Sequence, residues 1–464
     1  MKDTTPTIFI IFGITGDIAS RKILPALLSL YVKKKISSKF AIIGFTPEYI
    51  NKEDFRQSIR DNMGISPGKF REEDVKHFVD HIFYEQGYYD RPESYFSLLK
   101  RLKCLDDGFK QCSNKLFHLS VAPSLLKNIV ENLSVSGLSI PCEGNGGWTR
   151  IIIEKPFGYS ETSAIEINNK LLKIFTESQI FRTDYYLAKD VIQNILSFRF
   201  SNSIFEPLWN RNHIEKVHIK LYKSCGIEDN GSYYDKVGAL RDIGQSHLLQ
   251  ILALLSMEKP KVFDSEHFRK EKANIFKKLV IINKKTIQNC FVKAQYEGYK
   301  HEKNISEHAQ TETYFRLKTN INNKRWKNIP FYLEGGKALS ESKTEIDVYF
   351  NNKNIKISEN DEQNILTFRI QPEEGIKIRF WINNLYSEEN NDSKNLKFKY
   401  SDSKNFILNS NSHERIIIDA MDGNQTLFTS MNEQVYTWKY IDSIISNWQQ
   451  IPLGIYKKGS RDII

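Results

Sequence analysis

The chain has 464 residues, of which 40% are hydrophobic, and it carries a formal net charge of +10. Because a single hydrophobic core stops growing near ~250 to 300 residues, a chain of this length is expected to fold as two domains. The Lys and Arg residues are spread along the chain rather than gathered into one tail or motif. A nucleic acid partner is therefore the remoter alternative, and phosphate groups on a small ligand would also suit a positive molecule.

The five cysteines are odd in number, scattered and without a CxxC pair, which predicts neither a disulfide framework nor a metal site. The first residues, MKDTTPTIFIIFG, lack the basic segment of a signal peptide. No apolar run approaches the ~18 residues that span a membrane. We therefore expect a cytoplasmic protein in a reducing compartment, with no metal and no membrane association.

The first element in chain order is an apolar, β-branched strand over residues 7–12, which ends in a glycine turn. Residues 18–33 then place apolar side chains at helical spacing, and residues 40–45 form a second apolar strand. This order completes a βαβ unit. The alternation of strands and helices continues further, so residues 1–188 are predicted to form an α/β domain that binds a dinucleotide.

Beyond about residue 190 the pattern changes to long segments in which polar and apolar residues alternate: 216–222, 312–318, 346–350 and 365–370. Such alternation is typical of an antiparallel sheet with helices on one face. Residues 189–464 are therefore predicted to form an α+β domain with a large, mostly antiparallel sheet.

The glycine turn has the spacing Gly13-x-x-Gly16-x-x-Ala19 between the predicted strand and helix. Glycine permits a tight turn and close approach of the backbone, while the helix N-terminus offers N–H groups and a positive dipole to a pyrophosphate. Asp17 falls in the first helical turn, where a negative charge is favourable. Two glycines are a weak signal, and an ordinary strand-to-helix turn is the alternative.

Two later segments resemble the glucose-6-phosphate dehydrogenase family: Ile153–Gly158, which reads IEKPFG, and Arg182–Lys189, which reads RTDYYLAK. Further matching segments follow the family's order along nearly the whole chain: Gly13–Ala19, Pro207–Arg211, Arg241–Gln250, Gly336–Leu339, Ile370–Gly375 and Asp419–Phe428. Motifs in order over such a length make chance similarity a poor explanation.

The resemblance implies a Rossmann-like first domain and a substrate-binding and oligomerisation domain after it, in a homodimer or homotetramer. It also implies the oxidation of glucose 6-phosphate to 6-phosphoglucono-1,5-lactone, with hydride transfer to NADP or NAD, as the first step of the oxidative pentose phosphate pathway. Composition and spacing by themselves indicate only the two-domain α/β organisation.

Two residues are predicted to move the proton. Oxidation at the anomeric carbon needs a base for the hydroxyl proton, and a neutral imidazole suits this near pH 7. His247 matches the family's catalytic histidine, and Asp184 matches the carboxylate that orients it. Without the resemblance, a histidine on an apolar helix would be a core residue, and an aspartate before two tyrosines would form a turn.

The remaining predicted site residues bind substrate or cofactor, and the resemblance assigns them. By themselves the lysines would be ordinary surface charges. The substrate-binding residues are Lys155, Tyr185, Lys189, Asp242 and Lys337. The cofactor-binding residues are Gly13, Thr15, Gly16, Asp17, Thr46 and Lys155.

The chain departs from the family on the sugar side. Tyr185 stands where the family has a histidine that binds the substrate phosphate, and a tyrosine brings no positive charge. Lys223 replaces a substrate-binding glutamate, and Glu334 replaces an arginine. Ser342 replaces a basic residue, for which Lys343 is a possible compensation.

The cofactor side departs as well. Pro47, followed by Glu48, stands where the family usually has an arginine that clamps the 2′-phosphate of NADP. Arginine favours NADP, whereas a carboxylate favours NAD. Arg21, Lys22 or Arg56 is an alternative source of the charge, so NAD use and dual use both stay open. Two further alternatives are a catalytically silent relative that keeps the fold and an enzyme for a different sugar.

Overall fold

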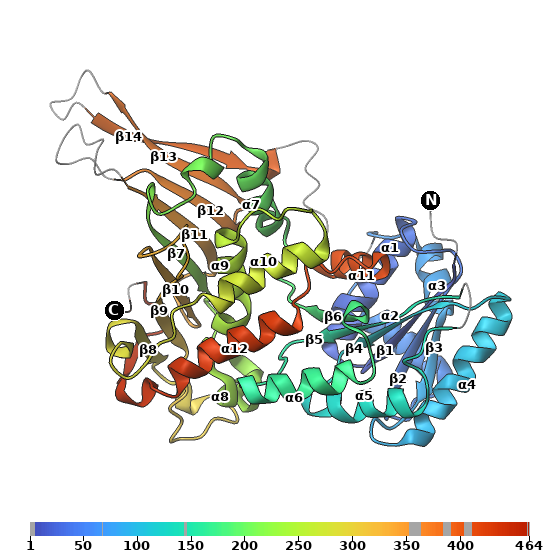
Figure 1. Ribbon diagram of the computed structural model, residues 1–464. Coiled ribbons are helices and arrows are strands. Elements are labelled where there is room, and N and C mark those ends of the chain that lie inside the picture. The colour runs from blue at the N-terminus through green and yellow to red at the C-terminus, as the bar shows by residue number, and fades with distance from the viewer. Residues whose placement is uncertain are drawn as a thin grey trace. The chain divides into compact units, whose positions relative to one another are not determined.

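A computed structural model describes residues 5–66, 68–142, 146–351, 363–383, 391–402, 411–461 and 463. The chain divides into two compact units (Figure 1). Unit 1 comprises Met1–Gly158, Thr162–Ala188 and Ser410–Met431, and unit 2 comprises Tyr159–Glu161, Lys189–Asn409 and Asn432–Ile464. The segment Ser410–Met431 thus packs with unit 1, although it follows residue 188 by more than two hundred positions.

Unit 1 is built on a parallel six-stranded sheet in the order β3-β2-β1-β4-β5-β6. The central strands are apolar and buried throughout, as a sheet covered on both faces requires. The strands are β1 Thr7–Phe12, β2 Phe40–Thr46, β3 Ile82–Gln86, β4 Asn114–Leu119, β5 Thr149–Glu154 and β6 Ile180–Thr183. The predicted Rossmann-like α/β fold is confirmed.

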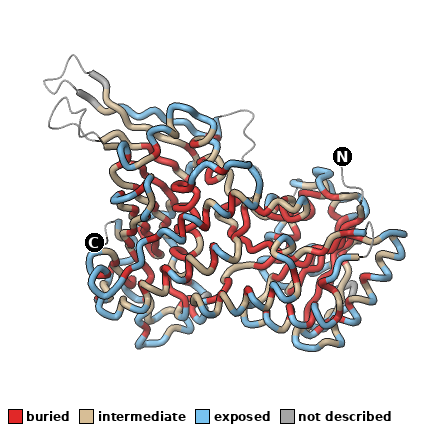
Figure 2. Tube along the Cα trace, in the orientation of Figure 1, coloured by how far each residue is buried: buried red, intermediate tan, exposed pale blue. Residues whose placement is uncertain are grey.

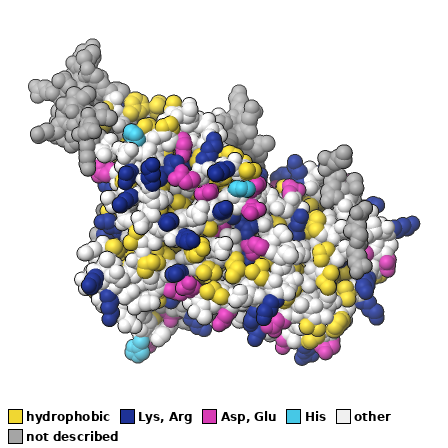
Figure 3. Space-filling view, in the orientation of Figure 1, with side chains coloured by type: hydrophobic (Ala, Val, Ile, Leu, Met, Phe, Trp, Pro, Cys, Tyr) yellow, Lys and Arg dark blue, Asp and Glu magenta, His cyan; other side chains and the backbone are white. Residues whose placement is uncertain are grey.

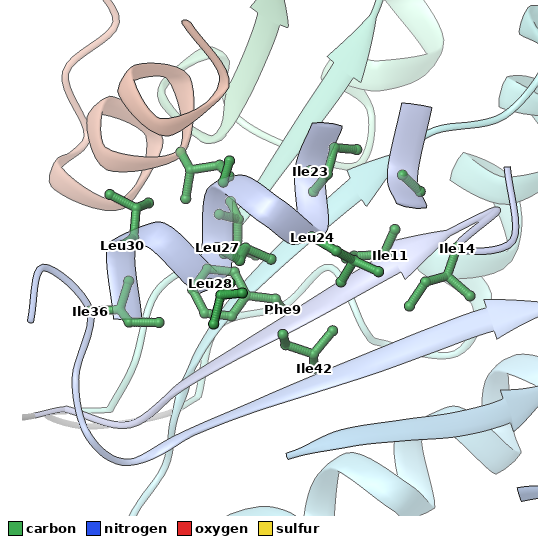
Figure 4. Close-up of a cluster of buried hydrophobic side chains, with 14 of the residues drawn as sticks. Phe9, Ile11, Ile14, Ile23, Leu24, Leu27, Leu28, Leu30, Ile36 and Ile42 are labelled. Carbon is green, nitrogen blue, oxygen red and sulfur yellow. The ribbon is translucent and has the colours of Figure 1, made fainter. Parts of the chain in front are cut away.

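Helices cover both faces of this sheet, and each face has its own buried cluster. Figure 4 shows the first, in which Phe9 and Ile11 of β1 face Leu24 and Leu27 of the first helix. The helices are α1 Leu24–Val32, α2 Lys52–Asn62, α3 Glu72–Asp80, α4 Pro92–Phe109, α5 Leu126–Val135, α6 Glu161–Leu172 and α11 Ser412–Asp422. Helix α11 joins the cluster of α1 through its apolar side chains.

Unit 2 is built on a nine-stranded sheet in the order β14-β13-β12-β11-β7-β10-β9-β8-β15. Among the residues that the structure describes, only β7/β10 and β8/β15 pair in parallel, so the predicted mostly antiparallel sheet is confirmed. The strands are β7 Ile214–Tyr222, β8 Phe291–Tyr296, β9 Tyr314–Asn320, β10 Pro330–Gly336, β11 Lys343–Phe350, β12 Ile365–Gln371, β13 Gly375–Asn383, β14 Asn391–Lys399 and β15 Leu453–Tyr456.

The helices of unit 2 lie on one side of its sheet (Figure 1). They are α7 Asp190–Ser201, α8 Gly231–Ala239, α9 Leu249–Ser256, α10 Ser265–Lys277 and α12 Met431–Ile445. A π-helical segment, η6 Leu240–Leu248, joins α8 to α9. Figure 2 shows the central helices and the strands beneath them buried within the unit.

One sequence-based expectation is wrong. The sulfur atoms of Cys112 and Cys142 are bonded to each other, with 6.4 Å between their Cα atoms. This pair has no local sequence signal, because thirty residues separate the two cysteines and only the folded chain brings them together. No helix among the described residues is long and apolar enough to cross a membrane. On the face shown in Figure 3, Lys and Arg side chains are dispersed among acidic ones rather than collected in a patch.

Candidate active site

The glycine turn follows β1 at the carboxyl edge of the unit 1 sheet. Gly13 has a φ of 74°, and a Cβ atom there would lie 2.4 Å from the backbone oxygen of Ser120. Its N–H donates to the oxygen of Phe45, and the N–H of Gly16 donates to the oxygen of Gly13, both at 3.0 Å. Only glycine fits position 13, because both the positive φ and the contact with Ser120 exclude a side chain.

The turn presents Thr15, Gly16 and Asp17 to solvent, while Ile14 is buried against Gly44 of β2. The following helix begins with a π-helical segment, η1 Ala19–Ile23, which continues into α1. An exposed turn of this shape at a helix N-terminus fits the pyrophosphate of a dinucleotide.

Thr46 ends β2 beside this turn and is buried. The backbone after it is held in place by Tyr84, whose hydroxyl donates to the oxygen of Glu48, and by Gln86, whose amide donates to the oxygen of Pro47 at 3.2 Å. Burial raises the pKa of Tyr89, whose hydroxyl bonds to Thr46 and to the backbone of Gly13.

Of the three candidate cations for a 2′-phosphate, Lys22 is exposed, and Arg56 and Arg21 contact other groups of the protein. The guanidinium of Arg56 donates to the backbone oxygens of Ile82 and Asp80, at the amino end of β3. That position is at the opposite edge of the sheet from the turn, so Arg56 is removed as a candidate. Arg21 forms an exposed ion pair of 2.8 Å with Asp17, which is a weak interaction.

Lys155, Asp184 and Tyr185 lie at the same edge of the sheet, because they follow β5 and β6 directly. Asp184 is buried, and its Oδ1 accepts from the N–H of Tyr186 at 3.0 Å. This is the Asx turn expected for an aspartate in such a context. The carboxylate that matches the family's orienting aspartate therefore also shapes the loop after β6.

Tyr185 belongs to a buried polar cluster with Glu154, His118 and His413. Its hydroxyl donates to Oε1 of Glu154 at 2.8 Å, and Nε2 of His118 lies 3.0 Å from the same oxygen. Burial would raise the pKa of Glu154, but hydrogen bonds from His118 and Tyr185 bring it below its ordinary value. The ring of His413, from α11, stacks on Tyr185 with 4.1 Å between centroids.

This cluster leaves His413 neutral at pH 7. Burial lowers its pKa to about 4, despite the nearby negative charge of Glu154. The single proton of the Tyr185 hydroxyl is used on Glu154, so the described conformation does not offer that proton to a phosphate. Burial and the charge of Glu154 also raise the pKa of Tyr185.

His247 and Asp242 lie in unit 2 on η6. His247 is buried, and Asp242 is partly exposed. Because a π-helix closes its turns with i→i+5 hydrogen bonds, two residues five positions apart lie on the same side of it. The π-helical segment therefore brings the predicted base and the predicted sugar-binding carboxylate onto one side, which an ordinary α-helix would not do.

Glu312 holds the start of this helix. Its Oε1 accepts from the N–H of Leu240 at 2.9 Å, and its backbone oxygen accepts from Ala239 at 3.0 Å. Gly238, with a φ of 72°, makes room for the carboxylate, since a Cβ atom there would lie 2.4 Å from Oε1. Complete burial raises the pKa of Glu312 to about 7, although Leu240 donates to it and Arg241 is close.

Three lysines lie near one another at the ends of β7, β10 and α7. The N–H of Lys223 donates to the oxygen of Gly336, and the N–H of Leu339 donates to the oxygen of Lys223, so Lys223 and Lys337 occupy adjoining loops. Lys189 donates to Gln371 at 2.9 Å. Burial lowers the pKa of Lys189, and the charge of Lys223 lowers it further.

The buried Tyr234 connects these loops to η6. The ammonium of Lys337 lies 4.8 Å from the centre of its ring. Burial raises the pKa of Tyr234 well above its ordinary value, and the charges of Asp242 and Glu312 act in the same direction. Tyr234 thereby links Asp242 to Lys337, and Lys223, on the adjoining loop, links Lys337 to Lys189 through its charge.

Ser342, one of the departures on the sugar side, and Lys343, its suggested compensation, both have structural roles. Ser342 Oγ accepts from the N–H of Ser224 at 3.0 Å, which fixes the loop after β7. Lys343 forms an ion pair of 3.0 Å with the buried Glu345, so its charge is already matched within the sheet.

The structure corrects the interpretation of Glu334, which the sequence placed near the sugar. Its carboxylate contacts His218 at 2.7 Å and Tyr314 at 2.6 Å. The next residue, Gly335, packs against Ile243 of η6, and neighbouring residues of a strand face opposite ways. Glu334 therefore faces away from the helix that carries His247. Burial would raise its pKa, but hydrogen bonds from His218 and Tyr314 lower it to about 2.

Sequence reasoning missed His118, Glu154, His413 and Glu312. Glu154 lies inside a quoted motif, which was a usable signal. Glu312 looked like the polar member of an alternating strand, and His413 is more than two hundred residues from its partners, so neither had a local signal.

Comparisons with known proteins agree with this architecture. Residues 10–194 match the model of the glucose-6-phosphate dehydrogenase NAD binding domain, and residues 196–463 match the model of its C-terminal domain. The glucose-6-phosphate 1-dehydrogenase of Aggregatibacter actinomycetemcomitans is 35% identical over 448 residues, covering 94% of this chain and 90% of the relative. That of Bacillus subtilis (strain 168) is 34% identical over 456 residues, covering 95% and 91%.

Solved structures give the same result. A glucose-6-phosphate dehydrogenase in complex with glucose 6-phosphate superposes with a TM-score of 0.90 at 30% identity, covering 100% of this chain and 96% of that one. The enzyme from Mycobacterium avium superposes with a TM-score of 0.84 at 28% identity, covering 98% and 95%. The chain described here belongs to the glucose-6-phosphate dehydrogenase family.

Proposed function

We propose that this chain oxidises glucose 6-phosphate at its anomeric carbon to 6-phosphoglucono-1,5-lactone, the first step of the oxidative pentose phosphate pathway. The observation that carries the proposal is the group of lysines in unit 2. Lys223 and Lys337 occupy adjoining loops, and the charge of Lys223 adds to burial in lowering the pKa of Lys189, so a dianionic ligand would stabilise the ammonium groups gathered there. A sugar phosphate supplies that charge.

His247 is the proposed base. Its imidazole accepts the proton of the anomeric hydroxyl, and Asp184 is the carboxylate that orients the ring and stabilises the imidazolium. Asp242, on the same side of η6 as His247, accepts a hydrogen bond from a sugar hydroxyl. Lys155, Lys189 and Lys337 are proposed to bind the sugar and its phosphate, and Tyr185 is proposed to pack beside them.

The nicotinamide cofactor supplies the hydride acceptor when bound. The tight turn that the positive φ of Gly13 allows, with Thr15, Gly16 and Asp17 exposed after it, fits its pyrophosphate. Thr46 ends the strand that leads to the adenosine ribose. Pro47 and Glu48 supply no cation there, so we propose that the enzyme uses NAD at least as well as NADP.

The test is an assay of reduced nicotinamide formation by the purified chain with glucose 6-phosphate, using NAD and NADP in parallel. Turnover that falls by at least about a thousandfold in His247→Ala, with the fold intact by circular dichroism, is the expected result. Absence of turnover in the folded wild-type protein would favour a silent relative. Equal efficiency with unphosphorylated glucose would favour a different sugar.

We also propose a cytoplasmic location and a homodimer or homotetramer. The location is supported by the match to a relative from Solanum tuberosum that is called a cytoplasmic isoform, 32% identical and covering 97% of this chain and 88% of the relative. Subcellular fractionation and light scattering of the purified protein test the two statements separately.

A further inference from the structure

A second polar site lies at the amino edge of the unit 1 sheet. Cys112 comes just before β4, and Cys142 follows α5 in the chain. Both are partly exposed, and their sulfur atoms are bonded. The glycine turn follows Phe12 at the other end of β1, and six residues of strand, about 20 Å, separate the two edges. This site is therefore separate from the proposed dehydrogenase chemistry.

A buried ammonium group is aimed at one of the two sulfur atoms. Lys115 is only 7% exposed, although lysines are seldom buried unless they are paired. Its Nζ donates to Oδ2 of Asp106 at 2.9 Å, to the backbone oxygen of Ser113 at 3.3 Å and to Sγ of Cys142 at 3.4 Å. The three acceptors use the three protons of the ammonium. A positive charge at this distance favours the thiolate of Cys142 over its thiol.

Asp106 lies beside the other sulfur atom, Sγ of Cys112. Its Oδ1 accepts from the N–H and the hydroxyl of Ser113, at 3.0 and 2.6 Å, which fixes the carboxylate. Its Oδ2 lies 3.9 Å from Sγ of Cys112. A carboxylate in this position can accept the proton that Cys112 releases when it reacts.

The same side chains also resemble a metal site, since ligand atoms of Asp106, Cys112 and Cys142 lie within 4.8 Å of one another. The ammonium of Lys115 already bonds to two of these three groups and supplies the positive charge that a cation would bring. The geometry therefore favours thiol chemistry over metal binding.

We propose that Cys112 and Cys142 form a reversible thiol–disulfide site that exchanges with low-molecular-weight disulfides such as oxidised glutathione. The Cys142 thiolate attacks one sulfur of the oxidised glutathione, which forms a mixed disulfide and releases one glutathione thiolate. The Cys112 sulfur, having lost its proton to Asp106, then attacks Cys142 and releases the second glutathione. Two electrons pass from the two cysteines to glutathione, and the two protons leave with its thiols.

The first experiment equilibrates the full-length protein with mixtures of reduced and oxidised glutathione that cover reducing and oxidising compartments. The thiols are then trapped by alkylation and quantified by mass spectrometry. The proposal expects the Cys112–Cys142 pair to pass reversibly from dithiol to disulfide within this range. A pair that stays fully oxidised or fully reduced in every mixture overturns it.

The second experiment follows the alkylation rate of the reduced protein at about pH 7, where only thiolates react quickly. Cys142 is expected to react faster than the exposed Cys104 of α4, which is the internal reference. Lys115→Gln is expected to slow Cys142 about tenfold, and Lys100→Gln, at an exposed position of α4, should leave the rate unchanged. If Lys115→Gln does not fold, the comparison with Cys104 in the wild-type protein decides.

Two further outcomes oppose the proposal, and they are distinct. Equal or slower reaction of Cys142 than of Cys104 removes Lys115 as the activating group. Retention of one equivalent of zinc by the reduced protein after dialysis identifies a metal site instead. Neither result bears on the proposed oxidation of glucose 6-phosphate, since that activity is measured separately.

Discussion

Replacing Glu312 with glutamine should change how the stability of the protein depends on pH. Burial raises the pKa of Glu312 from 4.5 to about 7, which makes the protonated acid the preferred form in the folded state. Its stabilising contribution is therefore complete below the unfolded pKa and is lost as the pH rises through the folded pKa. A shift of this size corresponds to about 3 kcal/mol.

Glutamine is the matched replacement because its amide oxygen can still accept from the N–H of Leu240, while the side chain no longer titrates. The free energies of unfolding of wild-type protein and Glu312→Gln should therefore be compared by urea denaturation at several pH values. The difference between them is expected to move by about 3 kcal/mol in favour of the variant from about pH 4.5 to pH 8.

Arg241, Lys293, Tyr234 and Asp242 face this carboxylate, but the substitution leaves them in place, so their titration largely cancels in the comparison. A difference that stays constant over the whole range would refute the reasoning. It would show that Glu312 has the same pKa in the folded and unfolded states, because Arg241 and Lys293 offset its burial.

Four further outcomes are expected. Gly13→Ala should raise the KM for the cofactor at least about tenfold and lower the thermal midpoint, since its Cβ would meet Ser120; unchanged values in kinetics and calorimetry would contradict this. Tyr185→His should lower the KM for glucose 6-phosphate roughly tenfold, and an unchanged or raised KM counts against a phosphate role at this position. Pro47→Arg should shift the ratio of kcat/KM values toward NADP about tenfold or more; no shift would place the 2′-phosphate elsewhere. Reduction of the Cys112–Cys142 pair should lower the free energy of unfolding by about 3 kcal/mol, because a disulfide across thirty residues constrains the unfolded chain, and Cys142→Ser should be insensitive to reductant.

The fold was largely predictable because it depends on periodic patterns. The buried strand at residues 7–12, its glycine turn and the following helix are local features with clear signals, and the structure has β1 at Thr7–Phe12. The long alternating segments of the second half likewise predicted antiparallel strands. Their order in the sheet was not predictable, because β7 pairs with β10 and β11 through contacts far apart in the sequence.

The candidate site was predictable only where residues lie in motifs. The sequence places His247 and Asp242 five positions apart, but it carries no signal that this segment is π-helical. Only the structure shows that the two residues lie on the same side of the helix. Segment Ser410–Met431 follows residue 188 in the chain and yet packs in unit 1, which is how His413 reaches Tyr185. Such pairings depend on tertiary packing, which single-sequence patterns do not report.

The departures from the family pattern fall into two kinds once the contacts of their side chains are known. The carboxylate of Glu334 is hydrogen-bonded to His218 and Tyr314, so its replacement of the family's arginine does not indicate a change in sugar binding. Tyr185 and Lys223 are different, because we predict that they change the charge at the proposed substrate site. At position 185 the family's histidine, which can carry a positive charge, is replaced by a neutral tyrosine. At position 223 the family's glutamate is replaced by a positively charged lysine.

The balance of these two changes argues for a retained phosphate ligand rather than a lost one. Loss of one charge-assisted bond weakens binding by about 1.5 to 3 kcal/mol, and removal of one carboxylate together with gain of one ammonium acts in the opposite direction. Burial lowers the pKa of Lys189 and the charge of Lys223 lowers it further, so an anionic ligand beside these two lysines would be stabilised. If this is the compensation for Tyr185, Lys223→Glu should raise the KM for glucose 6-phosphate in the wild-type background, and the double variant Tyr185→His/Lys223→Glu should recover most of the loss. A rise in KM from Lys223→Glu that is equally large in the wild-type and Tyr185→His backgrounds would show that the two positions act independently.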